Sequence, residues 1–166
     1  MPTMRRLVLI ALFLSACTGE PGNAPVTTAV AASAEASAKE LTNCFLAGDF
    51  RPMARLTLPA IVDGMGGPDA MAKRIAEGMK GGPKVVGARA GSATTHHRGD
   101  VHYAFVPFTL EFAGMLGTEA KDSYLLGVSR DDGRTWHFVD GGNLTREKLL
   151  RVLPDFPSDL ELPKRS

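Results

Sequence analysis

The spacing of apolar residues changes abruptly at Gly81-Gly82-Pro83. Before this point, apolar side chains recur every three or four residues, as on one face of an α-helix. After it, they alternate with polar ones, as along a half-buried β-strand. The sequence therefore predicts a helical part followed by a sheet. Helices and strands that are segregated along a chain in this way are typical of an α+β fold.

The N-terminus carries a separate signal. Arg5 and Arg6 precede an apolar run over residues 7–14, which is too short for the roughly 20 residues of a membrane-spanning helix. The run ends in Leu14-Ser15-Ala16-Cys17. This segment resembles the bacterial lipobox, which implies cleavage before Cys17 and attachment of lipid, palmitate included, to that cysteine. Thr18 follows, and by the family's sorting rule it implies an outer-membrane lipoprotein that faces the periplasm.

Four parts of the chain are expected. Residues 1–16 would be the signal peptide, and residues 17–34 the lipidated cysteine with a flexible tether. Residues 18–34 are rich in Ala, Ser and Thr and contain no aromatic residue, so they offer little surface to bury. Residues 35–153 would form one folded domain, and residues 154–166 an irregular tail.

Helix signals precede the change of spacing and return near the C-terminus. Glycine favours the end of a helix and proline its first turn, so Gly48 and Pro68 set two of the boundaries. Residues 60–62 are expected to form a brief strand after Pro59. The expected helices are residues 35–47, a short one between Asp49 and Pro59, one that begins at Pro68, and residues 145–153.

Alternating segments predict four antiparallel strands, at residues 84–96, 101–112, 121–129 and 134–140. The second of them is apolar on both faces for half its length. One face is expected to cover the helices. The other is expected to meet a second subunit or another part of the envelope. The two faces carry Ala104, Val106, Phe108, Leu110 and Phe112 on one side and Val101, Tyr103 and Phe105 on the other.

This order of elements resembles that of nuclear transport factor 2-like domains over roughly residues 35–141. The resemblance implies a cone of curved antiparallel sheet, of about four to five strands, closed by helices. That superfamily includes ketosteroid isomerase-like enzymes, dehydratases and many binding domains without catalytic activity. The fold alone does not choose among them.

Residues 129–136 match a known turn motif. The segment Ser129-Arg130-Asp131-Asp132-Gly133-Arg134-Thr135-Trp136 resembles the Asp-box of sialidases, Ser-x-Asp-x-Gly-x-Thr-Trp. In that family the box is structural. Asp131 is expected to accept hydrogen bonds from turn amides, Gly133 to adopt a positive φ, and Trp136 to fold over the loop. We therefore interpret Ser129, Asp131, Gly133 and Trp136 as a structural turn.

Two histidines could face each other across a hairpin. If Gly99 and Asp100 form a two-residue turn, His97 lies opposite His102. A metal would need a third protein ligand, and Asp100 is poorly placed to provide it. A solvated pair without metal is therefore the expected state, and we expect neither a metal nor a cofactor.

Three carboxylates are candidates for an acid in an apolar pocket, which can act as a base when desolvation shifts its pKa. Asp49 is better explained as a helix cap, and Glu111 is expected to face solvent. Asp140 follows Trp136 and Phe138 on one strand face, which makes it the best catalytic candidate of the three. The expected pocket residues are Tyr103, Phe108, Trp136 and Phe138.

The sequence favours a lipid-anchored envelope protein with a non-catalytic domain that binds a small apolar ligand or a protein partner. It contains no run of basic residues, so nucleic acid is not expected as a partner. One alternative is a ketosteroid isomerase-like enzyme that acts on a hydrophobic substrate with Asp140 as base. Another is a structural homodimer joined through residues 101–108. An open apolar cavity would favour binding, a buried carboxylate the enzyme, and a filled core the structural role.

Overall fold

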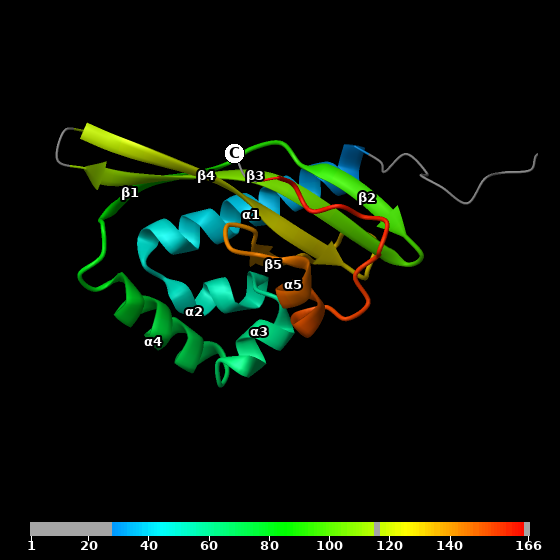
Figure 1. The fold of residues 1–166 in the computed structure, drawn as a ribbon, viewed down its shortest axis with the longest axis horizontal. Coiled ribbons are helices and arrows are strands. Elements are labelled where there is room, and N and C mark those ends of the chain that lie inside the picture. The colour runs from blue at the N-terminus through cyan, green and yellow to red at the C-terminus, as the bar shows by residue number, and fades with distance from the viewer. Residues whose placement is uncertain (1–27, 115–116, 165–166) are drawn as a thin grey trace, which may run out of the picture.

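The structure of the protein is a computed structural model that describes residues 28–114 and 117–164. The lipobox and Cys17 lie outside the described residues, as do residues 18–27 of the expected tether. Figure 1 shows the strands crossing the upper half of the view, with α2, α3 and α4 in the lower half. The helices are α1 (Thr28–Ala47), α2 (Phe50–Met53), α3 (Pro59–Gly64), α4 (Pro68–Met79) and α5 (Arg146–Val152), and a short 3-10 turn covers Ala54–Leu56.

The strands form one antiparallel sheet, ordered β1-β3-β4-β5, with β2 also paired to β3. The predicted α+β class, with helices followed by an antiparallel sheet, is confirmed. The long strand β3 pairs with β1 through its C-terminal half and with β2 through its N-terminal half. The strands are β1 (Val85–Ala90), β2 (Thr94–Arg98), β3 (Val101–Gly114), β4 (Gly117–Ser129) and β5 (His137–Asp140).

Both faces of the N-terminal half of β3 are largely buried within the chain. One face packs on α1 and carries a core made of Ala34, Ala38, Leu41, Ala104, Val106, Phe108, Leu125, Trp136 and Phe138. The opposite core combines the sheet with α5 and the C-terminal segment, and contains Tyr103, Phe105, Leu126, Val128, Leu149, Leu153, Phe156 and Leu160. Tyr103 and Phe105 are only 1% and 7% exposed. The chain itself therefore covers most of residues 101–108, and Pro107 is the residue of this range that stays exposed.

The first helix begins earlier than predicted. It starts at Thr28 rather than at residue 35, so residues 28–34 are helical and not part of a tether. Ala34 and Ala38 are fully buried in the core that α1 shares with the sheet. Small side chains bury little surface each, but they let the helix backbone lie close to the sheet. Packing against the sheet thus stabilises a segment whose composition alone suggested a coil.

Two of the predicted strands differ from those of the structure. Residues 60–62 lie in α3, not in a strand, because Pro59 occupies the first turn of a helix, where its missing N–H costs nothing. The expected strand at residues 84–96 is divided into β1 and β2. Between them the backbone turns aside: the amide of Gly91 donates to the Pro107 carbonyl at 2.8 Å, and that of Ala93 donates to Glu35 Oε1 at 2.8 Å.

Several boundaries follow the sequence signals. Gly48 adopts a φ of 70° after the end of α1, a left-handed conformation that glycine tolerates. Thr145 caps α5 by accepting a hydrogen bond from the Lys148 amide at 3.3 Å. The C-terminal segment after Pro154 has no helix or strand among its described residues. It is nevertheless part of the domain, because Phe156 and Leu160 are both buried.

Candidate functional site

An apolar cavity of about 420 Å³ lies between the helices and the sheet. This volume falls in the range of ordinary small-molecule sites. Helices α1, α3 and α4 and strands β3, β4 and β5 all contribute to its wall, which therefore joins segments far apart in the sequence. The lining residues are Leu41, Phe45, Met53, Thr57, Ile61, Met65, Met71, Ile75, Phe108, Leu110, Leu125, Phe138, Val139 and Asp140.

The helical part of the wall follows from the spacing of apolar residues. Leu41 and Phe45 of α1 are four residues apart, as are Met71 and Ile75 of α4, so each pair lies on one helix face. The spacing predicts which residues share a helix face, and it does not distinguish a filled core from the wall of a cavity. Three methionines line the same space, and their flexible side chains can adapt to a ligand's shape.

Only two polar side chains occur among the described residues of the cavity wall, those of Thr57 and Asp140. The Thr57 hydroxyl donates to the carbonyl of Met53 at 3.0 Å. Asp140 is exposed to solvent at the end of β5. Its Oδ1 accepts hydrogen bonds from the Ser123 hydroxyl at 3.0 Å and from the Gly142 amide at 2.9 Å. Asp140 therefore lies at the edge of the cavity and is not buried inside it.

The predicted pocket residues divide into two groups. Phe108 and Phe138 line the cavity. Trp136 is 2% exposed and packs behind the wall, with its ring 6.4 Å from that of Phe138. Tyr103 belongs to the core on the opposite face of the sheet. It lies five residues before Phe108 on β3, and side chains an odd number of residues apart on a strand point to opposite faces. Tyr103 is thus excluded from the pocket.

The two other candidate carboxylates do not reach the cavity. Glu111 forms an ion pair with Arg89, with Oε1 2.7 Å from Nη2. Asp49 occupies the N-cap position of α2, but its side chain makes no capping hydrogen bond. The prediction that Asp49 caps this helix is therefore right in position and wrong in mechanism.

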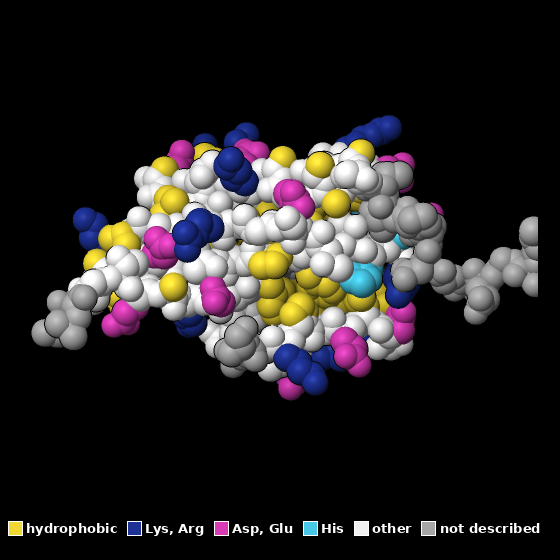
Figure 2. Space-filling model, turned by 90° about the horizontal axis from the view of Figure 1, so that it is seen from above, with side chains coloured by type: hydrophobic (Ala, Val, Ile, Leu, Met, Phe, Trp, Pro, Cys, Tyr) yellow, Lys and Arg dark blue, Asp and Glu magenta, His cyan; other side chains and the backbone are white. Residues whose placement is uncertain are grey.

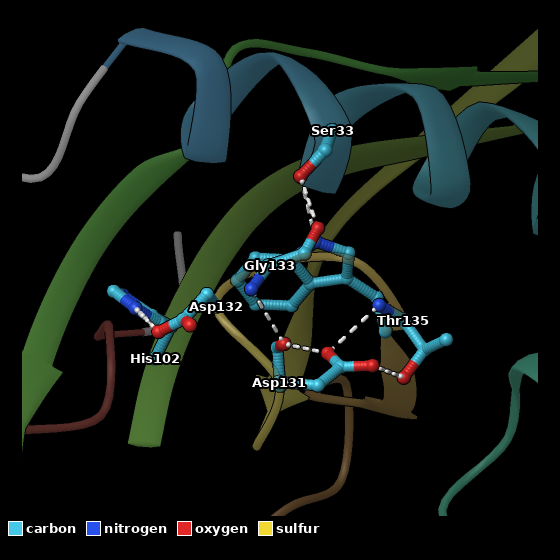
Figure 3. A network of polar contacts seen from close by, with 8 residues as sticks. Ser33, His102, Asp131, Asp132, Gly133 and Thr135 are labelled. Carbon is cyan, nitrogen blue, oxygen red and sulfur yellow. Dashed lines mark hydrogen bonds and ion pairs between the residues drawn. The ribbon is translucent and has the colours of Figure 1, made fainter. Parts of the chain in front are cut away.

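The segment 129–136 forms a hydrogen-bonded turn (Figure 3). Asp131 Oδ1 accepts from the Ser129 hydroxyl at 2.8 Å and from the Thr135 amide at 2.9 Å, and its Oδ2 accepts from the Thr135 hydroxyl at 2.6 Å. These bonds, those from Thr135 first, lower the pKa of Asp131 to about 2. Gly133 has a φ of 78°.

The same turn is joined to α1 through Ser33. The indole N–H of Trp136 donates to the Gly133 carbonyl at 3.1 Å and to Ser33 Oγ at 3.0 Å. The Ser33 hydroxyl in turn reaches the Gly133 carbonyl at 2.7 Å, and Figure 3 shows this side chain pointing from α1 to the turn. These contacts give the motif a structural explanation that needs no ligand.

The two histidines face each other as the hairpin rule predicts. His97 pairs with His102 in the register of β2 and β3, and the rings stack 4.3 Å apart. The expectation that both are solvated is wrong for His102, which is 8% exposed. Burial and the neighbouring His97 lower its pKa, and its Nε2 lies 3.9 Å from Asp132 Oδ1. No group of three potential metal ligands is found in the described part of the chain.

A second hollow lies on the sheet beside the C-terminal segment. It measures about 650 Å³, and its lining includes Phe105, Pro107, Lys121, Asp122 and Lys164. Figure 2, seen from above, shows hydrophobic side chains in a hollow with charged side chains around it. Because charged residues of both signs line this larger groove, the apolar cavity is the stronger candidate for a small-molecule site.

Comparison with known proteins adds no family to this picture. No family model matches the chain, and no curated protein matches it. Among the described residues, no helix is both long and apolar enough to cross a membrane.

Proposed function

We propose that this chain is a lipid-anchored protein of the bacterial envelope whose folded domain binds a small apolar ligand without changing it chemically. The observation that carries the proposal is the cavity of about 420 Å³, whose wall is apolar except for Thr57 and Asp140. Open apolar space of this size is uncommon in a close-packed core. A ligand in the cavity would make van der Waals contacts with lining side chains that have no partner atoms on that side in the empty protein.

The predicted resemblance to nuclear transport factor 2-like domains supports the same location, since helices close the curved sheet in that superfamily. Here α1 and α4 supply Leu41, Phe45, Met71 and Ile75 to one wall of the cavity. The opposite wall comes from the sheet. A ligand held between the two layers would be largely withdrawn from water, which is the main source of affinity for an apolar molecule.

The enzymatic alternative depends on Asp140 as a base. A carboxylate with that role in a ketosteroid isomerase-like site needs apolar surroundings that shield it from water. Asp140 is instead exposed, and it is held by Ser123 and Gly142 in a turn. This arrangement favours binding over catalysis.

The membrane anchor is proposed from the sequence alone. The lipobox-like segment ending in Cys17 would place lipid on that residue after removal of residues 1–16. Several acyl chains on one cysteine would give the stable attachment that a single chain does not. The absence of aspartate after Cys17 supports the outer membrane, facing the periplasm, as the destination.

Titration with linear alcohols tests the binding proposal. The test uses a chain that begins at Thr18, which contains every helix and strand that the structure describes. Each added methylene that enters the cavity should tighten binding by about 0.8 kcal/mol, or roughly fourfold. This gain should level off once the chain fills the available space. Calorimetry, with native mass spectrometry for stoichiometry, measures both effects.

A pair of matched variants controls for nonspecific adsorption. Ile75→Phe adds volume inside the cavity, and Leu150→Phe adds the same kind of ring at an exposed position of α5. Only the first should weaken binding of the longest alcohols. Equal affinities in the two variants, or affinity that keeps rising with chain length, would place the alcohols outside the cavity and refute the proposal.

A further inference from the structure

The charge of the cavity wall is carried by a single residue. Asp140 is the only ionisable side chain among the described lining residues, and neither lysine nor arginine contributes to the wall. A ligand whose apolar body fills the cavity and whose polar end lies at the edge beside Asp140 would therefore meet a carboxylate and no cation among these residues.

The Asp140 carboxylate is held in a defined position. Its Oδ1 accepts both hydrogen bonds, from the Ser123 hydroxyl on β4 and from the Gly142 amide two residues further along. The second bond closes a turn of the kind that aspartate and asparagine favour. Because both bonds end on Oδ1, Oδ2 can accept a hydrogen bond from a ligand without breaking the turn.

An ionised carboxylate accepts hydrogen bonds and cannot donate them. A hydroxyl or an ammonium group can therefore pair with Oδ2, whereas the carboxylate of a fatty acid would face a like charge without a cation to offset it. From this, we propose that the cavity selects neutral or cationic amphiphiles, namely alcohols or primary amines on an apolar body, and discriminates against anionic ones. The inference rests on the proposed function, because it specifies the ligand of the same cavity.

The cavity also limits the size of the apolar body. At about 30 Å³ for each water-sized group, a space of about 420 Å³ holds on the order of 14 non-hydrogen atoms. Dodecyl compounds are close to this size. Dodecanol, dodecylamine and dodecanoic acid therefore make a matched series in which the head group and its charge change and the apolar chain does not.

The test compares the affinities of these three compounds at pH 7, below the concentrations at which they form micelles. We expect the order dodecylamine, dodecanol, dodecanoate, from tightest to weakest. Asp140 is exposed, so each step should be modest, about threefold to fivefold, as for other solvent-screened charge pairs.

The matched variants are Asp140→Asn and Asp122→Asn. Both remove one negative charge, but asparagine at position 140 can still accept the Gly142 hydrogen bond and so keep the turn. Asp122 lies on β4 and lines the other hollow instead. In Asp140→Asn the differences between the three compounds should shrink to less than about twofold. In Asp122→Asn the order and its spacing should be those of the original protein.

Each failure has a distinct meaning. If all three compounds bind with equal affinity, or if dodecanoate binds most tightly, the head-group inference is wrong and the binding proposal stands. The inference is also wrong if Asp140→Asn keeps the original differences. If none of the compounds binds to a protein that circular dichroism shows to be folded, the binding proposal itself is overturned, and the inference with it.

Discussion

The turn at residues 129–136 should make the stability of the domain depend on pH through one carboxylate. Asp131 accepts three hydrogen bonds, two of them from Thr135, and its pKa is lowered to about 2. In an unfolded chain the pKa of aspartate is about 3.9. Because the folded value is the lower one, the stabilisation is fully present above about pH 4. It is lost as the pH falls through the folded value near 2.

The size of this effect can be worked out by linkage. A fall in pKa from about 3.9 to about 2 would stabilise the folded state by at most about 2.6 kcal/mol at neutral pH. Asp131 is only partly buried, and solvent weakens interactions at such a site. We therefore expect a contribution of about 1–2 kcal/mol to the free energy of unfolding.

Urea unfolding at pH 6 and pH 3 measures this contribution. The Asp131→Asn variant should be less stable than the original protein at pH 6, and this difference should be about half as large at pH 3, because the stabilisation is lost only as the pH falls through the folded pKa of about 2. Asp100→Asn is the matched control, since Asp100 is an exposed residue of the β2–β3 turn. If Asp131→Asn loses as much stability between the two pH values as the original protein does, Asp131 does not carry the effect and the reasoning fails.

Three further changes have defined outcomes. Ser33→Ala should lower the free energy of unfolding by about 1 kcal/mol in chemical denaturation, because the Trp136 indole loses one of two partners; no change would mean that water replaces the hydroxyl. Gly127→Ala should cost about 1–3 kcal/mol, since its Cβ would lie 2.6 Å from Phe138 Cε1, and an unshifted melting temperature would contradict this packing. Cys17→Ser should abolish incorporation of labelled palmitate in growing cells, and continued labelling would refute the lipobox interpretation.

The sequence predicted best what depends on local chemistry. Gly48 ends α1 and Pro68 begins α4, because glycine and proline act through their own backbone preferences. The facing of His97 and His102 likewise follows from a two-residue turn between them. Such rules need only neighbouring residues, so they hold without knowledge of the rest of the fold.

Predictions that depend on distant contacts were less accurate. Residues 28–34 resemble a tether in composition, yet α1 includes them because Ala34 and Ala38 fit against the sheet. The sequence predicts that Pro59 ends one helix, whereas in the structure it begins another. Both outcomes depend on which surfaces are near in space, and one sequence without its fold does not supply that information.

The cavity could be predicted only in part. Phe108 and Phe138 were expected to line a pocket and do so. The sequence predicts Tyr103 in the same pocket, but this side chain lies on the other face of β3. The helical stripes that hold Met71 and Ile75 were visible in the sequence, but a stripe that fills a core and one that borders empty space have the same spacing. The difference arises from how far apart the helices and the sheet pack.

The early start of α1 limits how far the domain could travel from a membrane. Ten residues separate Cys17 from Thr28, and whatever their conformation, covalent geometry limits that span to about 40 Å. This is close to the thickness of one bilayer with its head groups. With lipid on Cys17, Thr28 would stay within that distance of the bilayer surface, and the cavity would lie farther from it by no more than the dimensions of the domain. Amphiphiles that leave the bilayer surface would then reach the cavity at a high local concentration, so even weak binding would keep the cavity occupied.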